Sequence, residues 1–232
     1  MINKLNIIYP DYSWNGELTT RSKTDLIVWH HSESGDVSAL EIDSWHKNRV
    51  NDPFIGIGYN FVIHWDGSIE AGRPINVQGA HAYGINNRSI GICFTGKYDQ
   101  PNDMPELQFN SGVQLTAWLL ENYPSCEIIG HRDAVNYGGD ASSCPGQYFP
   151  FDEIKNKVLE LMEEINIGKL IDVHLNYYKY GVQAIKDLAT NKELLSNPDE
   201  HIATLGKTDE NSLDWLNLVV NARMAKKSGF IK

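Results

Sequence analysis

Four short apolar runs in the first 130 residues are typical of buried β-strands. They lie at residues 26–29, 59–63, 89–94 and 127–129 and are rich in β-branched or aromatic residues. Apolar runs of this length, without alternation of polar positions, indicate strands that are covered on both faces. We therefore expect a sheet that is buried between layers of helix.

Helical periodicity appears between and after these runs. Residues 38–48 form the first predicted helix, with Ser38 as its N-cap and with Leu40, Ile42 and Trp45 as expected buried positions. A second helix is predicted over residues 106–122, and a third from about residue 151 to 165. The expected buried positions of the second helix are Leu107, Val113, Leu115, Trp118 and Leu119. The order β-α-β-β-α-β-α predicts an α/β fold with a central mixed β-sheet flanked by helices.

Two connections have their own signals. Asp66-Gly67 stands between extended runs and predicts a tight hairpin. Residues 134–143 are rich in Gly, Asn, Ser and Asp and predict a loop, with His131 just before it and Cys144 just after it. Functional residues often lie where such loops leave a rigid scaffold.

Charge and targeting signals narrow the function classes. Residues 1–165 contain 11 Lys and Arg against 22 Asp and Glu, whereas residues 166–232 contain nine against eight. An acidic surface argues against nucleic acid as a partner, because phosphate binding needs a basic one. The first ten residues are too poor in apolar residues for a secretory signal, and no run of 18 apolar residues occurs. We expect synthesis in the cytoplasm and no membrane span.

Cysteine and histidine positions suggest a metal site. Cys93, Cys126 and Cys144 form no CxxC pair and are odd in number, which argues against a disulfide framework. Two imidazoles and one thiolate, with a fourth position open, are what a catalytic zinc requires. His30, His131 and Cys144 are the predicted ligands. His31 is the alternative to His30, because adjacent side chains of a strand point to opposite faces and only one can reach the metal.

Several ordered blocks carry a resemblance to a known family. They are Trp29-His30-His31, Gly58-Tyr59-Asn60, Asp66-Gly67, Gly79-Ala80-His81, Asn86-Asn87-Arg88-Ser89, Gly130-His131-Arg132 and Cys144-Pro145-Gly146. In this order they resemble the type 2 N-acetylmuramoyl-L-alanine amidases, a family that includes phage lysozyme-type amidases and peptidoglycan recognition proteins. The resemblance covers about residues 20–160.

The resemblance implies roles for individual residues. His30, His131 and Cys144 match the family's zinc ligands, and Tyr59 matches the tyrosine that hydrogen-bonds the water or the developing oxyanion. Ser142 stands where the family usually has Lys or Thr, so rate and pH optimum are open at this position. His81 lies in a block near the family's substrate groove, where it would contact substrate or support a ligand. Asn86, in the same block, is expected to contact substrate.

The predicted function is therefore a zinc-dependent amidase that cuts bacterial peptidoglycan between the lactyl group of muramic acid and L-alanine. An origin as a phage or prophage endolysin released by a holin fits the expected lack of a signal. A non-catalytic peptidoglycan recognition module and a cysteine-type wall endopeptidase, with Cys144 as nucleophile, are the alternatives.

Two domains are predicted. Residues 1–165 form the catalytic domain, and residues 166–232 form a small helical module with amphipathic stretches at 177–189 and 213–226. This module could bind the cell wall, or it could pack on the catalytic domain or join two copies in a homodimer.

Overall fold

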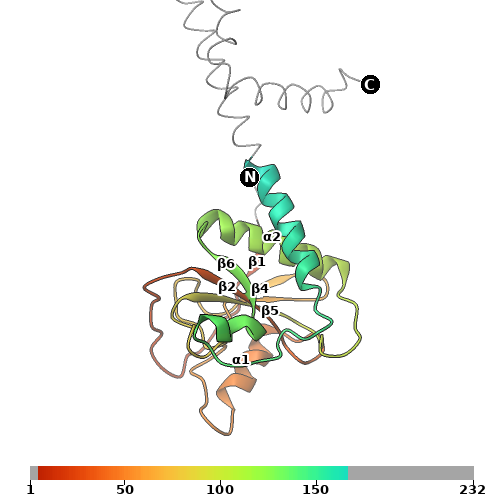
Figure 1. Cartoon of the computed structure of the whole chain (residues 1–232). Coiled ribbons are helices and arrows are strands. Elements are labelled where there is room, and N and C mark those ends of the chain that lie inside the picture. The colour runs from red at the N-terminus through yellow and green to blue at the C-terminus, as the bar shows by residue number, and fades with distance from the viewer. Residues whose placement is uncertain (1–4, 167–232) are drawn as a thin grey trace, which may run out of the picture. The chain divides into compact units, whose positions relative to one another are not determined.

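The computed structural model describes residues 5–166, and the predicted C-terminal module with its wall-binding and homodimer alternatives lies outside them. The first compact unit of the chain runs from Met1 to Met162. The described part contains a six-stranded mixed sheet between two layers of helix (Figure 1). The predicted α/β class with a mixed sheet flanked by helices is confirmed.

The strand order is β1-β4-β3-β5-β2-β6. The six strands are β1 (Ile7–Ile8), β2 (Leu26–His31), β3 (Phe61–Ile63), β4 (Ile69–Ala71), β5 (Ser89–Phe94) and β6 (Glu127–Gly130). Only β3 and β4 pair antiparallel, and every other neighbouring pair is parallel. The predicted hairpin joins β3 to β4, with Gly67 at a φ of 81° that suits a tight turn.

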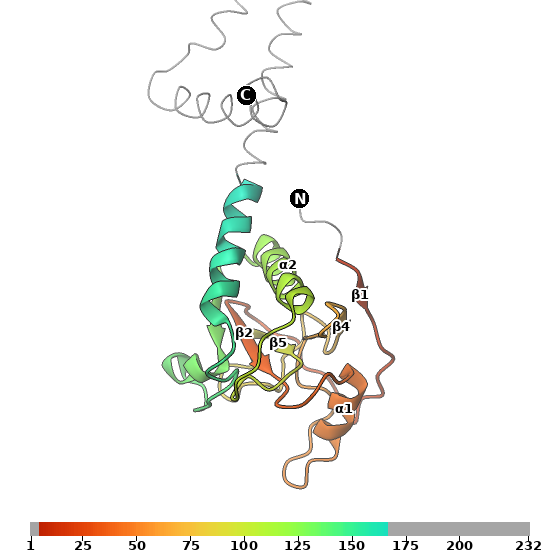
Figure 2. The ribbon, with the colours of Figure 1, turned by 90° about the vertical axis from the view of Figure 1, so that its right-hand side faces the viewer.

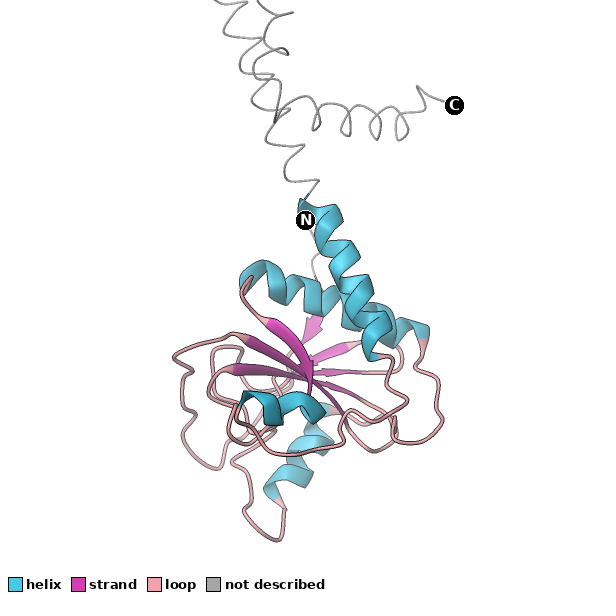
Figure 3. Cartoon of the chain, in the orientation of Figure 1, coloured by secondary structure: helices cyan, strands magenta, loops and turns pink. Residues whose placement is uncertain are grey.

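Helices cover both faces of the sheet (Figure 3). One face lies under α2 (Glu106–Asn122) and a helix over residues 151–166, which crosses α2 in Figure 1 and lies next to it in Figure 2. The other face carries α1 (Ala39–Lys47) and the 3₁₀ helix η1 (His131–Tyr137). In the described residues no helix is long and apolar enough to cross a membrane.

The two central strands divide their side chains between two cores. Ile27 and Trp29 of β2 belong to the large core beneath α2, whereas Leu26 and Val28 belong to a smaller core with Ala134 of η1. Because strand side chains alternate, the next residue on the smaller-core face is His30. The apolar pattern of β2 therefore aims His30 toward η1.

Some expected buried positions are wrong. Leu40 and Trp45 of α1 are 47% and 46% exposed, and Leu107 of α2 is 60% exposed. Of the three expected in α1, Ile42 alone is buried, because one face of this short helix meets the sheet. The predicted loop 134–143 is also wrong in its first part, since η1 extends to Tyr137 and ends at Gly138 with a φ of 88°.

Candidate metal centre and active site

Three predicted ligands meet on the η1 face of the sheet. The ligand atoms of His30, His131 and Cys144 all lie within 4.8 Å of one another. Sγ of Cys144 is 3.7 Å from Nδ1 of His30, close to the separation of about 3.5 Å that zinc–ligand lengths of about 2.3 and 2.0 Å give in a tetrahedron. This donor set fits zinc. The ring of His31 points elsewhere, and its Nδ1 accepts a hydrogen bond from the backbone N–H of Tyr98.

A chain of hydrogen bonds fixes the tautomer of His30. The Ser89 hydroxyl donates to the carbonyl of Ile85 at 2.8 Å, and a carbonyl can only accept. The Ser89 oxygen is then left to accept from Nε2 of His81 at 3.4 Å. His81 therefore lacks a proton on Nδ1, which lies 3.0 Å from Nε2 of His30 and accepts its proton. Nδ1 of His30 keeps a free lone pair facing Cys144.

His81 is held in place by close packing. Its ring is buried against Gly91 of β5, where an added Cβ would come within 2.5 Å of it. Parallel pairing puts Gly91 opposite Val28 and Cys93 opposite His30. The absent side chain at Gly91 thus leaves the space in which His81 reaches His30.

Backbone and side-chain contacts also hold the other two predicted ligands, His131 and Cys144. Nε2 of His131 lies 3.0 Å from the Asp140 carboxylate, which leaves its Nδ1 for a metal. The carbonyl of Cys144 accepts from the N–H of Arg132 at 2.6 Å, and Sγ accepts from the N–H of His31 at 3.4 Å. Both ends of the excursion from His131 to Cys144 are therefore tied to the sheet and to η1.

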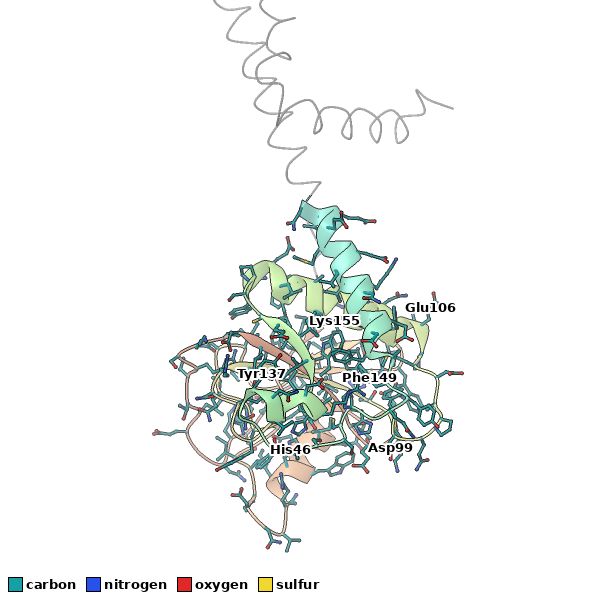
Figure 4. The ribbon with its side chains drawn as sticks, viewed as in Figure 1. His46, Asp99, Glu106, Tyr137, Phe149 and Lys155 are labelled. Carbon is teal, nitrogen blue, oxygen red and sulfur yellow. The ribbon has the colours of Figure 1, made fainter. Side chains whose placement is uncertain are left out.

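Tyr59 is placed by α1. Asp43 and His46, one turn apart on α1, accept the backbone N–H groups of Ile57 and Gly58 at 2.7 and 2.9 Å. These bonds fix the two residues just before Tyr59, whose ring centroid is 5.1 Å from that of His30. Figure 4 shows His46 where α1 approaches η1 in that view.

Burial sets the protonation states of these groups. Burial, with the neighbouring imidazoles, lowers the pKa of His30 well below its ordinary value, so the ring is neutral as a ligand must be. Burial raises the pKa of Tyr59 well above its ordinary value, so the hydroxyl keeps the proton that it would donate.

Burial also raises the pKa of Cys144 to about 12. The metal-free thiol is therefore protonated at neutral pH, whereas a cysteine nucleophile is activated by a lowered pKa. This environment disfavours a cysteine-type endopeptidase and suits a thiol that loses its proton to a metal.

The two remaining predicted site residues, Ser142 and Asn86, accept hydrogen bonds from backbone N–H groups near the cluster. Oγ of Ser142 accepts from the N–H of Cys144 at 3.1 Å. Oδ1 of Asn86 accepts from the N–H groups of His81 and Ala82 at 2.8 and 2.9 Å. Sequence reasoning missed Ser89 and Asp140. Ser89 stands in a recognised block and Asp140 in the predicted loop, but their partners depend on tertiary contacts.

Comparisons with known proteins agree with this geometry. The family model described as N-acetylmuramoyl-L-alanine amidase matches residues 20–147, which include the clustered His30, His131 and Cys144. The chain belongs to this family. The resemblance predicted from the sequence blocks is confirmed, and so is the activity of an N-acetylmuramoyl-L-alanine amidase.

Relatives of this amidase include phage proteins. The endolysin of Enterobacteria phage K11 is 33% identical over 128 residues, which cover 51% of this chain and 82% of the relative. The structure of the endolysin amidase LysCS from Clostridium intestinale has a TM-score of 0.62 and 33% identity, covering 68% of this chain and 98% of that one. Drosophila PGRP-LB shares the fold, with a TM-score of 0.55 and 23% identity over 65% of this chain and 93% of that one.

Proposed function

We propose that this amidase is zinc-dependent and that His30, His131 and Cys144 hold the metal. The observation that supports the proposal is the convergence of their ligand atoms within 4.8 Å, from a strand and the two ends of an excursion. When bound, zinc supplies Lewis-acid activation of the attacking water and of the scissile carbonyl. Among the described residues, His81 and Asp140 fix the two imidazoles that would bind it.

The substrate we propose is bacterial peptidoglycan, cut at the amide between the lactyl group of muramic acid and L-alanine. The Tyr59 hydroxyl donates to the carbonyl oxygen as negative charge develops there, a contribution of about 2.7–4 kcal/mol for a well-placed donor. Ser142 accepts from the Cys144 N–H, so its own hydrogen is left for the same oxygen. Asn86 supports the turn that carries His81, and a contact of Asn86 with substrate stays a prediction.

The biological role we propose is that of an endolysin, by analogy with the phage relatives. Residues 1–165 would be the catalytic domain. Release through a holin, and the role of residues 166–232, stay predictions. A recognition module without catalysis is disfavoured because Tyr59 and all three ligands are present.

The decisive experiment treats purified sacculi with the protein, with and without a chelator and zinc add-back. We expect new N-terminal L-alanine that disappears on chelation and returns with zinc. Cys144→Ser should lose both zinc and activity, whereas Cys126→Ser, at a half-buried cysteine outside the cluster, should keep both. Chelator-insensitive release of other termini would point to a cysteine peptidase, and binding without release to a recognition protein.

Tyr59→Phe separates catalysis from metal binding. Its zinc content should stay unchanged, because the hydroxyl is not a ligand, while kcat falls about 100-fold or more through loss of an oxyanion donor. Zinc content by elemental analysis and kcat on a soluble muropeptide check this expectation. An unaltered kcat would remove Tyr59 from the mechanism.

A further inference from the structure

A histidine outside the candidate metal cluster lies between two carboxylates. His64 directly follows β3; its Nδ1 is 3.0 Å from Oδ1 of Asp36, and its Nε2 is 2.9 Å from Oε2 of Glu70 on β4. Ionised carboxylates only accept hydrogen bonds, so each ring nitrogen must donate, and only the imidazolium has a proton on both. The His64 side chain is 12% exposed, so water screens the two ion pairs only in part. His64 thus joins Asp36 to Glu70 through one positive charge.

The two carboxylates hold other segments in turn. Oε2 of Glu70 also accepts the N–H of Ala39, the first residue of α1, at 2.6 Å. This N–H is one of those that a helix leaves without an internal partner, and negative charge is favourable at a helix N-terminus. Oδ1 of Asp36 accepts from the Thr95 hydroxyl, next to the end of β5, at 2.7 Å. His64 therefore connects the β3–β4 hairpin with the segment that runs from β2 to α1.

Three carboxylates face His64. Asp36 comes from the segment before α1, Glu70 from β4 and Asp66 from the hairpin turn. Hydrogen bonds within its own turn, and then the charge of His64, lower the pKa of Asp66. Burial, and then the charge of Glu70, raise the pKa of Tyr12, so this neighbour of Glu70 stays uncharged. The imidazolium is thus the countercharge that lets carboxylates gather at the start of α1.

The position of α1 affects the site because α1 places Tyr59. Asp43 and His46 of α1 accept the two backbone N–H groups just before Tyr59, at 2.7 and 2.9 Å. The hairpin holds the same residue from its other side, since the N–H of Arg73, just after β4, donates to the Tyr59 carbonyl at 2.9 Å. A shift of α1 against the hairpin would therefore displace the Tyr59 ring.

We propose that His64, as an imidazolium between Asp36 and Glu70, is a positioning residue that fixes the start of α1 and through it Tyr59. This rests on the proposed role of Tyr59 in peptidoglycan hydrolysis. A neutral ring has one N–H and can donate to only one of the two carboxylates. A rise in pH that removes the second proton therefore frees one side of this link and slows hydrolysis, while the three proposed ligands keep their places.

The direct test uses ring ¹⁵N spectra and amide exchange of the full-length protein. At neutral pH both ring nitrogens of His64 should carry a proton. His64→Gln removes the charge, and deuterium exchange of the Ala39 N–H should become about tenfold faster or more, as weakening of a hydrogen bond to a charged group implies. In the parent the same exchange, corrected for the intrinsic effect of pH, should also become faster as the pH rises. A ring with a single proton at neutral pH, or parent-like exchange in His64→Gln, would overturn the proposal.

Activity should follow the same pattern. On a soluble muropeptide, His64→Gln should lower kcat by up to about tenfold at neutral pH, with KM and zinc content unaltered. His64→Arg supplies a planar cation that does not titrate, so the ratio of its kcat to that of the parent should rise with pH. Glu70→Gln, which keeps an acceptor for the Ala39 N–H, should act like His64→Gln, and the double variant should be no slower than either single one. A constant ratio, additive losses or an unaltered kcat in His64→Gln would contradict the positioning role.

Asp66→Asn is the matched control. It removes a carboxylate close to His64, but its Oδ1 still accepts from the N–H and the hydroxyl of Ser68, which lie at 2.8 and 2.7 Å in the parent. Exchange at Ala39 and kcat should stay as in the parent, and losses as large as those of His64→Gln would refute a specific role of His64. The ring and exchange measurements need no turnover, so they test the link to α1 separately from the proposed zinc-dependent reaction.

Discussion

At the scale of single residues, the proposed metal centre depends on groups that would not touch the metal. His30 presents Nδ1 to Cys144 because His81 occupies its other nitrogen, and Ser89 in turn sets the tautomer of His81. The ligand types and the choice of His30 over His31 could be proposed from motif and strand alternation. The chain of hydrogen bonds could not, because it joins residues brought together only by the parallel register of β2 and β5.

Ser89→Ala should weaken zinc binding without removing a ligand. The change leaves the Ile85 carbonyl and Nε2 of His81 without their partner in a buried site. Loss of such a supporting contact typically costs about 10- to 100-fold in metal affinity. Competition with a chromophoric chelator measures this, and ring ¹⁵N spectra of the metal-free protein should show a mixed His81 tautomer.

Ser89→Thr keeps the hydroxyl. It should therefore restore both the zinc affinity and the single His81 tautomer. Ser125→Ala removes an exposed hydroxyl and should change neither. If Ser89→Ala kept the parent's zinc affinity and an unaltered His81 tautomer, the role of the hydrogen-bond chain from Ser89 through His81 to His30 would be contradicted.

At the scale of elements, buried strands were the most predictable feature. β2 and β5 are covered on both faces, and their nearly continuous apolar runs therefore identify them as strands. β1 escaped prediction because two partly exposed residues carry no pattern. The buried face of α1 was predicted wrongly. Leu40 and Trp45 are hydrophobic and were therefore expected to be buried, but both are exposed. The 3₁₀ helix η1 was not predicted, because most of its residues fall in a stretch with the composition of a loop and so short a helix shows no apolar periodicity.

The close contact between α2 and β5 limits the size of the side chain at position 112 of α2. A Cβ on Gly112 would come within 2.5 Å of the fully buried Phe94 ring. Gly112→Ala should therefore destabilise the protein by up to about 2 kcal/mol, because a steric cost of about 1–3 kcal/mol is offset by a gain of only about 1 kcal/mol in helix propensity. Urea unfolding measures the difference.

Gln114→Ala is the control on the exposed face of α2 and should be neutral or slightly stabilising. A Gly112→Ala protein more stable than the parent would show that Phe94 can move away at little cost.

At the scale of the whole molecule, buried imidazoles make the metal-free fold sensitive to acid. Burial lowers the pKa of His46 to about 4, below the value of about 6.5 expected when unfolded. Between these values the unfolded chain binds the proton and the folded one does not. The stability that His46 confers is complete above pH 6.5 and is lost as the pH falls toward 4.

His46→Gln keeps an acceptor for the Gly58 N–H but cannot titrate. Between pH 6.5 and 4 the unfolding free energy of this variant should fall less steeply than that of the parent. The two slopes should differ by up to about 1.4 kcal/mol per pH unit. Urea titrations of the metal-free proteins at pH 7.5, 5.5 and 4.5 check this. Parallel slopes for parent and variant would refute it.

The placement of the three proposed ligands has a kinetic consequence. His30 lies on β2, between two other strands, where backbone hydrogen bonds open only when the sheet does. Cys144 follows an irregular segment whose ties to the body are individual contacts. Local opening of that segment withdraws one ligand while the sheet stays intact. A bound metal would therefore exchange with solution far faster than the β2 amide protons exchange with deuterium.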